Sequence, residues 1–455
     1  MAALLLQDLG ARPPGRGDPR MEDDGRGNSD LFDMARDRGY SELVRMMEDA
    51  SRRHQERMAL LDVLLRAVRE GSLEELDGLL AQKASVHEAD GAGLTLLHLA
   101  AARSDARGEG CCRRLLEARA DASAQNNELE ESPLFGAARG GSEAALVLLL
   151  DGRCDPRLRS RRGETALFAA ARAGREPVVS ALLRRGARAD DRDHAGRTAA
   201  FHAGGPGCAG ALRRLLEEAG ACDAVDSQGC TPLFTVEDAE CARVLVERGL
   251  RLDAADHAGK TALFHAAECD RAGVVRALLD CSASAAAVDA DGRTALHWAR
   301  GSEVPRLLLG ASAPVDHLDK IKQTALFFAA VRDDAAMVHA LSTAGASGAI
   351  RDINEQTPLF YAAREASLPV VQRLVCQALV DPAAKDVEGN TAVKKARERP
   401  KEGQDIVAYL ESVRRACAAQ SAAAGRGRGR GGRGSRDGGD ATPRRKRRPG
   451  LNAEG

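Results

Sequence analysis

Apolar and polar positions recur along this chain in a block of 33 residues, best seen from Thr165 to the next equivalent residue. The block reads TALFAAARAG, then REPVVSALLRRGA, with Gly174 and Gly186 closing the two stretches. Apolar residues in the second stretch recur at helical spacing, which predicts one apolar stripe. Thr165 suits a helix N-cap and Pro177 suits the first turn of a helix. The pattern predicts two short helices joined by a tight turn.

The hydroxyl residue that opens the block returns ten times in phase. These anchor residues are Thr95, Ser132, Thr165, Thr198, Thr231, Thr261, Thr294, Thr324, Thr357 and Thr391, at steps of 37, 33, 33, 33, 30, 33, 30, 33 and 34. We attribute the longest step mainly to extra residues between the two helices, at 104–110, and the short steps to residues lost at that junction. Such an internal repeat indicates stacked units that bury a shared core.

Two degenerate blocks precede the first anchor, at Ser29 and Asp62. Residues 51–58 are expected to extend a helix between them. The segment 51–58 lacks the Asp-x-x-Gly turn found before the other anchors, so the Ser29 block is either a true repeat or a separate helical cap.

A turn segment separates consecutive blocks. An Asp stands five residues before the anchor in eight of the ten blocks and a Gly stands two before it in seven, as in Asp193 and Gly196. The Asp side chain can bond turn amides, and Gly supplies the positive φ of a tight turn. We therefore expect a short finger between units.

The anchor stretches TALFHAA at Thr261, TALHWA at Thr294, TLLHLAA at Thr95 and TPLFYAA at Thr357 resemble an ankyrin-repeat protein. The resemblance implies an all-α solenoid of helix-turn-helix units with β-turn or hairpin fingers, and partner proteins bound on its concave face. The family has a His three residues after the Thr, which only His98 and His297 keep here; Phe replaces it at eight positions. We expect apolar stacking to replace part of the family's hydrogen-bond network.

Four segments follow from this pattern. Residues 1–28 are expected to be disordered, 29–94 to hold degenerate N-terminal capping repeats, 95–415 to form the repeat array, and 416–455 to be a disordered Arg/Gly-rich basic tail. The composition agrees, because only 3% of residues are aromatic while 44% are hydrophobic. A core of stacked repeats needs mainly Ala, Leu and Val.

Charge separates the tail from the rest. The chain has 66 Lys and Arg against 67 Asp and Glu, a net charge of −1. Residues 424–455 hold ten basic and three acidic residues, a net of +7, so residues 1–423 carry −8. No apolar run approaches the roughly 20 residues of a membrane helix, and the N-terminus lacks a basic lead-in to a signal peptide. We expect an intracellular protein, in the nucleus, the cytoplasm or both, with its 11 cysteines reduced and no membrane contact.

Nothing in the sequence predicts an enzyme. Phosphate-loop, HExxH and GxSxG motifs are absent, and the cysteines form no CxxC pair. Repeat phase alone accounts for His194, His202, His257, His265 and His297. We therefore predict no catalytic residues, no metal site, no cofactor and no small-molecule substrate.

The resemblance places the protein-binding surface on the fingers and the exposed side of the first helices. The candidate residues are Glu128, Glu131, Arg139, Arg161, Arg162, Glu164, Arg172, His194, Arg197, His257, Lys260, Arg293, Lys320, Lys322, Arg332 and Arg364. From Arg161 to Lys322 the finger tips lean basic, which suits an acidic peptide or surface.

Two basic motifs lie near the C-terminus. Residues 425–434 resemble an RGG-type segment, which binds RNA, and 443–449 resemble a nuclear-localisation signal read by an import receptor. The candidate residues are Arg426, Arg428, Arg430, Arg433, Arg444, Arg445, Lys446, Arg447 and Arg448. Methylation of the first four would keep their charge while blocking some hydrogen bonds.

The leading hypothesis is a non-enzymatic scaffold or adaptor whose repeats bind one or more proteins. The alternative is a nuclear RNA- or chromatin-associated protein that binds nucleic acid through its tail while the repeats recruit a partner. A third is a module of a larger signalling protein whose enzyme lies elsewhere. Fold alone does not decide among them.

Overall fold

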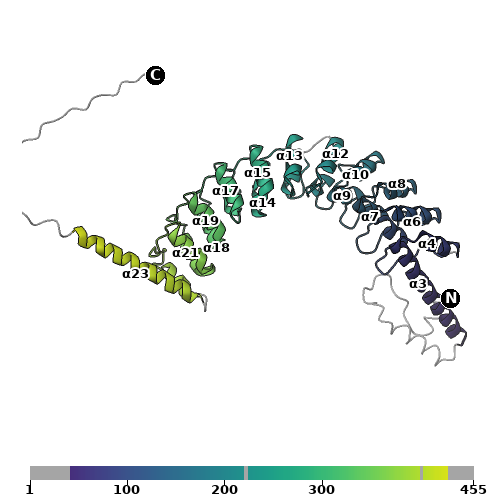
Figure 1. Cartoon of the computed structure of the whole chain (residues 1–455), viewed down its shortest axis with the longest axis horizontal. Coiled ribbons are helices and arrows are strands. Elements are labelled where there is room, and N and C mark those ends of the chain that lie inside the picture. Colours follow the sequence, from purple (N-terminus) through teal and green to yellow (C-terminus); the bar gives the residue numbers. More distant parts are fainter. Residues whose placement is uncertain (1–40, 83, 220–223, 400–402, 429–455) are drawn as a thin grey trace, which may run out of the picture. The chain divides into compact units, whose positions relative to one another are not determined.

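The computed structural model describes residues 41–82, 84–219, 224–399 and 403–428, and Figure 1 shows that helices dominate it. Within these ranges the only β-structure is two isolated bridges, from Ala89 to Thr95 and from Lys385 to Thr391. The all-α repeat fold expected from the sequence is confirmed. The segment 1–28 and the Ser29 anchor lie outside the described residues.

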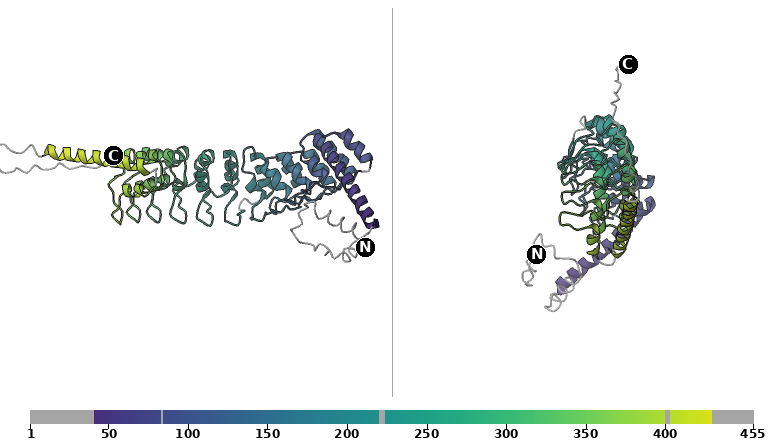
Figure 2. Two further views of the ribbon diagram at one scale, coloured as in Figure 1. Left: turned by 90° about the horizontal axis from the view of Figure 1, so that it is seen from below. Right: turned by 90° about the vertical axis from the view of Figure 1, so that its left-hand side faces the viewer.

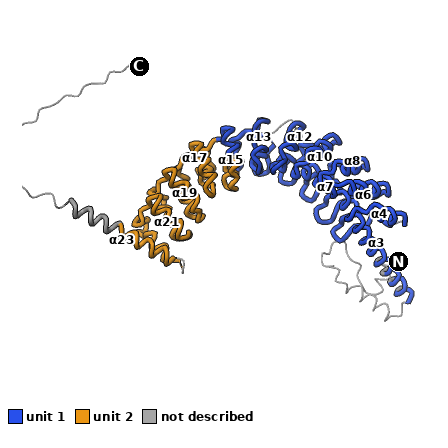
Figure 3. The backbone as a smooth tube through the Cα atoms, in the orientation of Figure 1, with its two compact units in different colours: residues 1–257, 276–283 blue, residues 258–275, 284–455 orange. Residues whose placement is uncertain are grey.

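The chain forms two compact units, coloured separately in Figure 3. Unit 1 comprises Met1–His257 and Arg276–Ala283, and unit 2 comprises Ala258–Val275 and Ser284–Gly455. Helix α15 (Ala272–Asp280) contributes residues to both units. Each unit is described by itself below.

Unit 1 holds the N-terminal helices. They are α3 (Ser41–Glu70), α4 (Leu73–Ala81), α5 (Leu96–Ala101), α6 (Ala106–Glu117), α7 (Pro133–Gly140), α8 (Glu143–Asp151), α9 (Ala166–Arg172), α10 (Glu176–Arg184), α11 (Ala199–His202), α12 (Ala209–Ala219), the 3₁₀ turn η1 (Pro232–Phe234) and α13 (Ala239–Glu247). The first helices α5, α7, α9 and α11 pack on one another in order, and α6, α8, α10 and α12 form a second row.

Unit 2 repeats this plan. Its helices are α14 (Ala262–Glu268), α16 (Ala295–Trp298), α17 (Glu303–Gly310), α18 (Ala325–Val331), α19 (Ala335–Thr343), α20 (Pro358–Glu365), α21 (Leu368–Cys376), α22 (Ala392–Arg397) and α23 (Gly403–Arg428). The first helices run α14, α16, α18, α20 and α22, while α17, α19, α21 and α23 pack behind them.

Small and aliphatic side chains build the core of both units. In the repeat that begins at Thr165, the side chains of Leu167, Phe168, Ala170 and Leu182 are fully buried. Ala on the inner side lets neighbouring first helices approach closely, and the Phe three residues after the anchor fills the space between them. Gly174 lies in the turn between α9 and α10 and has a φ of +65°, a conformation that favours glycine.

The length changes between repeats lie in the helices rather than in the connector. Helix α6 begins eleven residues after its anchor, as α10 does, but it has 12 residues against 9. Our placement of the extra residues between the helices is therefore wrong, because three of them extend α6 itself. In the two 30-residue repeats the first helix is one turn long, η1 or α16, so the missing residues shorten that helix.

The fingers are held by side-chain and backbone hydrogen bonds. Oδ1 of Asp193 accepts from the amides of Ala195 and Arg197, each at 2.9 Å. Oδ1 of Asp289 accepts in the same way from Asp291 and Arg293. The expected Asp-bonded turn is confirmed, and within each unit the finger loops project to one side of the helices (Figure 2).

Neighbouring fingers are joined to each other. In unit 1 the amide of Ser227 donates to the carbonyl of Ala195 at 2.9 Å, and in unit 2 the amide of Lys320 donates to the carbonyl of Asp291 at 2.9 Å. A finger that carries the Asp is therefore fixed both by that side chain and by the preceding finger.

Replacement of His by Phe changes the first helix as expected. Where His is kept, Nδ1 of His98 accepts from the amide of Thr95 at 3.1 Å, and Nε2 lies 2.9 Å from the carbonyl oxygen of Glu131 in the next repeat. Where Phe stands instead, as at Phe168, the ring is fully buried. The anchor hydroxyl of Thr165 is then buried without a hydrogen-bond partner, so it is an N-cap by position only.

Two long helices lie at the ends of the described chain. Helix α3 runs unbroken through residues 51–58, which confirms the predicted extension. Helix α23 continues past 415 to Arg428, so the first part of the expected tail is helical. None of the helices in the described ranges has the length and apolar character needed to cross a membrane.

Candidate functional site

The side of each unit formed by the fingers and first helices carries a second recurring position, four residues after the anchor. We call it the ring position, because it holds His202 in unit 1, and His265, Trp298, Phe328 and Tyr361 in unit 2. All five side chains are partly exposed. Four consecutive repeats of unit 2 thus present a ring at one place.

Trp298, Tyr361 and His202 are each tied to the Asp of their own finger, nine residues upstream. Nε1 of Trp298 donates to Oδ2 of Asp289 at 3.1 Å. The hydroxyl of Tyr361 donates to Oδ2 of Asp352 at 2.7 Å. In unit 1, Nε2 of His202 lies 3.3 Å from Oδ2 of Asp193. One carboxylate therefore serves the turn through Oδ1 and orients the ring through Oδ2.

Phe328 breaks this arrangement because its ring has no donor. Oδ2 of Asp319 is consequently buried without a hydrogen bond. The nearest cation is Arg293, whose Nε lies 3.6 Å away and is itself buried without a partner. The two groups attract electrostatically at a distance too long for a hydrogen bond.

Cations surround the rings at the centre of unit 2. We define the aromatic-cation cluster as Lys260, Arg293, Trp298, Phe328 and Arg332. Nζ of Lys260 lies 3.3 Å from the centroid of the Trp298 ring. The guanidinium carbon of Arg293 lies 5.6 Å from the Trp298 centroid and 5.3 Å from that of Phe328. These are cation-π distances.

Arg332 completes the cluster from the end of α18. Its guanidinium carbon lies 6.0 Å from the Trp298 centroid and 5.7 Å from the Phe328 centroid. Nη1 donates to the carbonyl oxygens of Trp298 and Ala299, each at 3.1 Å. Burial lowers the pKa of Arg332, and the charge of nearby Arg300 acts in the same direction. Among the described residues no carboxylate pairs with this half-buried cation.

In unit 1 the predicted surface charges largely neutralise one another. Four pairs form: Arg139 with Glu131 at 2.8 Å, Arg172 with Glu164 at 2.7 Å, Arg161 with Glu130 at 3.5 Å, and Arg197 with Asp226 at 3.4 Å. Glu128, Arg162, His194 and His257 are exposed on the fingers. The excess of basic residues that the sequence indicates is therefore small on this unit, because four of its cations pair with carboxylates.

In unit 2 more of the predicted cations remain unpaired. Lys260 lies 3.4 Å from Glu268, Arg293 lies 3.1 Å from Asp291, and Arg364 lies 2.7 Å from Glu365. Lys320 and Lys322 are exposed and, within the described ranges, form no ion pair. Arg332, Lys320 and Lys322 are therefore predicted cations of this unit that form no ion pair in the described ranges.

One group of residues in the described ranges has the spacing of a metal site, namely Glu164, Asp193 and His202 of unit 1. Nη2 of Arg172 already donates to Glu164 at 2.7 Å and lies 3.0 Å from Nδ1 of His202. Burial lowers the pKa of His202, and the charge of Arg172 acts in the same direction. The guanidinium is the cation that these groups face, so we assign them no metal.

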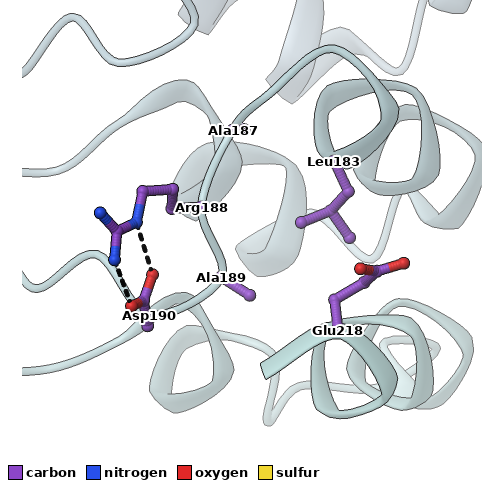
Figure 4. A pocket seen from close by; sticks show the side chains of 6 residues that line it. All are labelled: Leu183, Ala187, Arg188, Ala189, Asp190 and Glu218. Carbon is purple, nitrogen blue, oxygen red and sulfur yellow. Dashed lines mark hydrogen bonds and ion pairs between the residues drawn. The ribbon is translucent and has the colours of Figure 1, made fainter. Parts of the chain in front are cut away.

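A hollow of about 250 Å³ lies on the second-helix side of unit 1, lined by Leu183, Ala187, Arg188, Ala189, Asp190 and Glu218 (Figure 4). Arg188 and Asp190 satisfy each other through two hydrogen bonds, of 2.9 and 2.6 Å. The hollow gathers no nucleophile or acid-base pair from the lining residues, and we assign it no function.

The candidate tail residues are only partly placed. Arg426 and Arg428 lie in helix α23. Arg430, Arg433, Arg444, Arg445, Lys446, Arg447 and Arg448 lie outside the described residues.

Sequence reasoning missed the ring position and Arg300. A signal was present, because Phe328 is the one phenylalanine out of phase with the other eight, and Trp298, the single Trp of the chain, shares its register. What the sequence did not reveal is that the finger Asp and the ring, nine residues apart, meet in space.

A family model described as ankyrin repeats, which itself comprises three copies of the repeat, matches five overlapping ranges: 104–193, 134–223, 204–289, 235–315 and 301–386. Together these matches span 104–386, more than half of the 455 residues. A search of curated protein sequences finds none that matches this chain.

Proposed function

Because the chain belongs to the ankyrin-repeat family, whose repeats are generally protein-protein interaction modules, we propose that it is a non-enzymatic adaptor that binds a partner protein across its fingers and first helices. The observation that carries this proposal is the fixed geometry of the fingers. Oδ1 of the finger Asp holds its turn, as at Asp193, and a backbone hydrogen bond joins neighbouring fingers, as between Ala195 and Ser227.

A fixed surface favours binding because fewer side chains and loops must be ordered when the partner arrives. Exposed residues such as Arg162 and His194 in unit 1, and Lys320 and Ile353 in unit 2, stand on these fixed turns.

The alternative function is nucleic-acid binding through the basic tail, with the repeats recruiting a protein. It rests on the Arg-Gly run at 425–434 and the basic run at 443–449. A tail that contacts phosphates makes binding strongly salt-dependent.

Proximity labelling with the full chain and with a chain lacking 424–455 tests the two functions together. We expect the same specific proteins to be labelled by both chains, with any change confined to the compartment. Loss of every specific protein from the shortened chain, while the full chain retains RNA, would overturn the adaptor proposal in favour of the alternative.

A further inference from the structure

The exposed side of the aromatic-cation cluster in unit 2 has donors with no acceptor. Arg332 uses Nη1 for the carbonyls of Trp298 and Ala299, and its Nε and Nη2 bond no acceptor in the described part of the chain. These two atoms lie outside the set of buried atoms without a partner, so solvent reaches them. A guanidinium in this state presents the fork that a carboxylate accepts in a bidentate manner.

The surroundings reinforce this preference for an anion. Arg300 is exposed, forms no ion pair in the described residues, and lies close enough to act on the charge of Arg332. Lys320 and Lys322 add two unpaired cations on the next finger. Two carboxylates, Glu268 and Asp334, also act on the charge of Arg332, but neither forms an ion pair with it. The carboxylate of Asp319 is 1% exposed and faces Arg293 at 3.6 Å, so it is not accessible to a partner.

Apolar side chains flank the cations. Ile321 is 40% exposed and Ile353 is 55% exposed on neighbouring fingers, which the amide of Ile353 joins by donating to the carbonyl of Ile321 at 3.2 Å. Val331, beside Arg332, is 39% exposed. A partner that matches this face therefore needs an apolar side chain next to its carboxylates.

We propose that this face of unit 2 is the docking site for an acidic segment of a partner protein, with a carboxylate seated on Arg332 and Arg300 and an apolar side chain against Ile321 and Ile353. The inference rests on the proposed adaptor function and narrows it to one site and one partner chemistry. In unit 1, by contrast, the cations Arg139, Arg172 and Arg197 already pair with carboxylates.

Single-stranded nucleic acid fits this face less well, although it too would bring negative charge. Base stacking needs an open ring face. Nζ of Lys260 covers one face of Trp298 at 3.3 Å, and Arg293 and Arg332 both lie near Trp298 and Phe328. The rings hold the cations in place rather than offering platforms to bases.

The test uses the full chain and a library of labelled peptides that mix Asp and Glu with Leu and Ile in varied order. Fluorescence anisotropy measures the binding of these peptides to the chain. A library with Lys in place of the acidic residues and a labelled single-stranded RNA serve as competing probes. Arg300→Glu and Lys320→Glu reverse exposed charges of the face, and Arg306→Glu on α17 is the matched control on the second-helix side. Arg332→Gln, whose folding is checked by circular dichroism, tests the guanidinium that is proposed to bind the carboxylate.

We expect the acidic library to bind, and each reversal at Arg300 or Lys320 to weaken binding about tenfold. Arg306→Glu should leave affinity unchanged, and added salt should weaken it. Equal loss in all three reversal variants would overturn the proposal, because binding would then follow net charge. Preference for RNA or for the Lys library would also overturn it.

Two different results separate a wrong docking site from a wrong adaptor function. If proximity labelling recovers a specific partner but neither the acidic library nor that partner responds to Arg300→Glu, the docking site is wrong and the adaptor function stands. If the chain lacking 424–455 recovers no specific partner, both are wrong.

Discussion

The indole Nε1 of Trp298 donates a hydrogen bond to Oδ2 of Asp289, nine residues upstream, at 3.1 Å. Asp289 also accepts two finger amides through Oδ1. A single carboxylate therefore couples the shape of the finger to the orientation of the ring on the first helix. Tyr361 with Asp352, and His202 with Asp193, repeat the same relationship.

Trp298→Phe should destabilise the protein. The smaller ring keeps most of the apolar contact but leaves Oδ2 of Asp289 without its donor, and a hydrogen bond to a charged group contributes about 2 kcal/mol. Urea unfolding followed by circular dichroism measures the loss. Tyr361→Phe, which removes the equivalent donor to Asp352, should show a loss of similar size. An unchanged free energy of unfolding in both variants would contradict the coupling.

Phe328→Tyr should have the opposite effect. Phe328 holds the ring position of its repeat. In the next repeat the ring position is Tyr361, whose hydroxyl bonds its finger Asp at 2.7 Å, whereas Oδ2 of Asp319, the finger Asp of the Phe328 repeat, is buried without a partner. A hydroxyl at this place would complete the missing bond and raise the free energy of unfolding by about 1 kcal/mol. The same urea experiment reports it. A destabilised variant would mean that Arg293 cannot move aside for the hydroxyl.

The effect on stability of removing the anchor hydroxyl should depend on whether His or Phe stands three residues later. Thr165 has a buried hydroxyl without a partner beside Phe168, so Thr165→Val should leave stability unchanged or raise it by up to about 1 kcal/mol. The hydroxyl of Thr294 lies 3.0 Å from Nδ1 of His297, so Thr294→Val should lower stability by about 1 kcal/mol. Thermal unfolding of the two variants decides the matter, and equal effects would argue against the role given to the Phe.

Acid should destabilise the repeats through two buried histidines. Burial lowers the pKa of His98 and of His297 below the value of 6.5 that each has when exposed. The unfolded chain therefore binds protons first as the pH falls. Stability is complete above about pH 6.5 and declines below it, toward the folded-state pKa values. The amide of Thr95 can only donate, so Nδ1 of His98 must stay unprotonated.

Melting temperatures across this pH range measure the effect. A variant with both His98→Phe and His297→Phe should melt lower at neutral pH but depend less on pH between about 5 and 6.5. If its pH dependence matches that of the unaltered chain, other groups control the response to acid.

Thiol reactivity should follow burial. Burial raises the pKa of Cys112 to about 12 and that of Cys241 to about 12, whereas Cys269 and Cys376 are exposed. Because the thiolate is the reactive form, iodoacetamide should modify the exposed pair first in the folded chain and the buried pair only on unfolding. Peptide-level mass spectrometry resolves each site. Early modification of Cys112 would contradict the packing of α6.

Local periodic features were accessible to sequence reasoning. The anchors from Thr95 to Thr391, the Asp-bonded turns and the helix ends at Gly174 and Gly186 all follow from short-range rules of capping and turn geometry. Length differences were harder, because an extra helical turn in α6 and an insertion in its connector give the same spacing between Thr95 and Ser132.

The repeat, its period and the small apolar residues that stack can be read from the amino-acid sequence, because each of these depends on neighbours within one block. Which charges form no ion pair becomes clear only when the chain is folded. Arg172 is neutralised by Glu164 across a helix and a finger, while Arg332 meets carbonyl oxygens and no carboxylate. The physical reason is that an ion pair depends on distance in space, and folding alone brings finger and helix together.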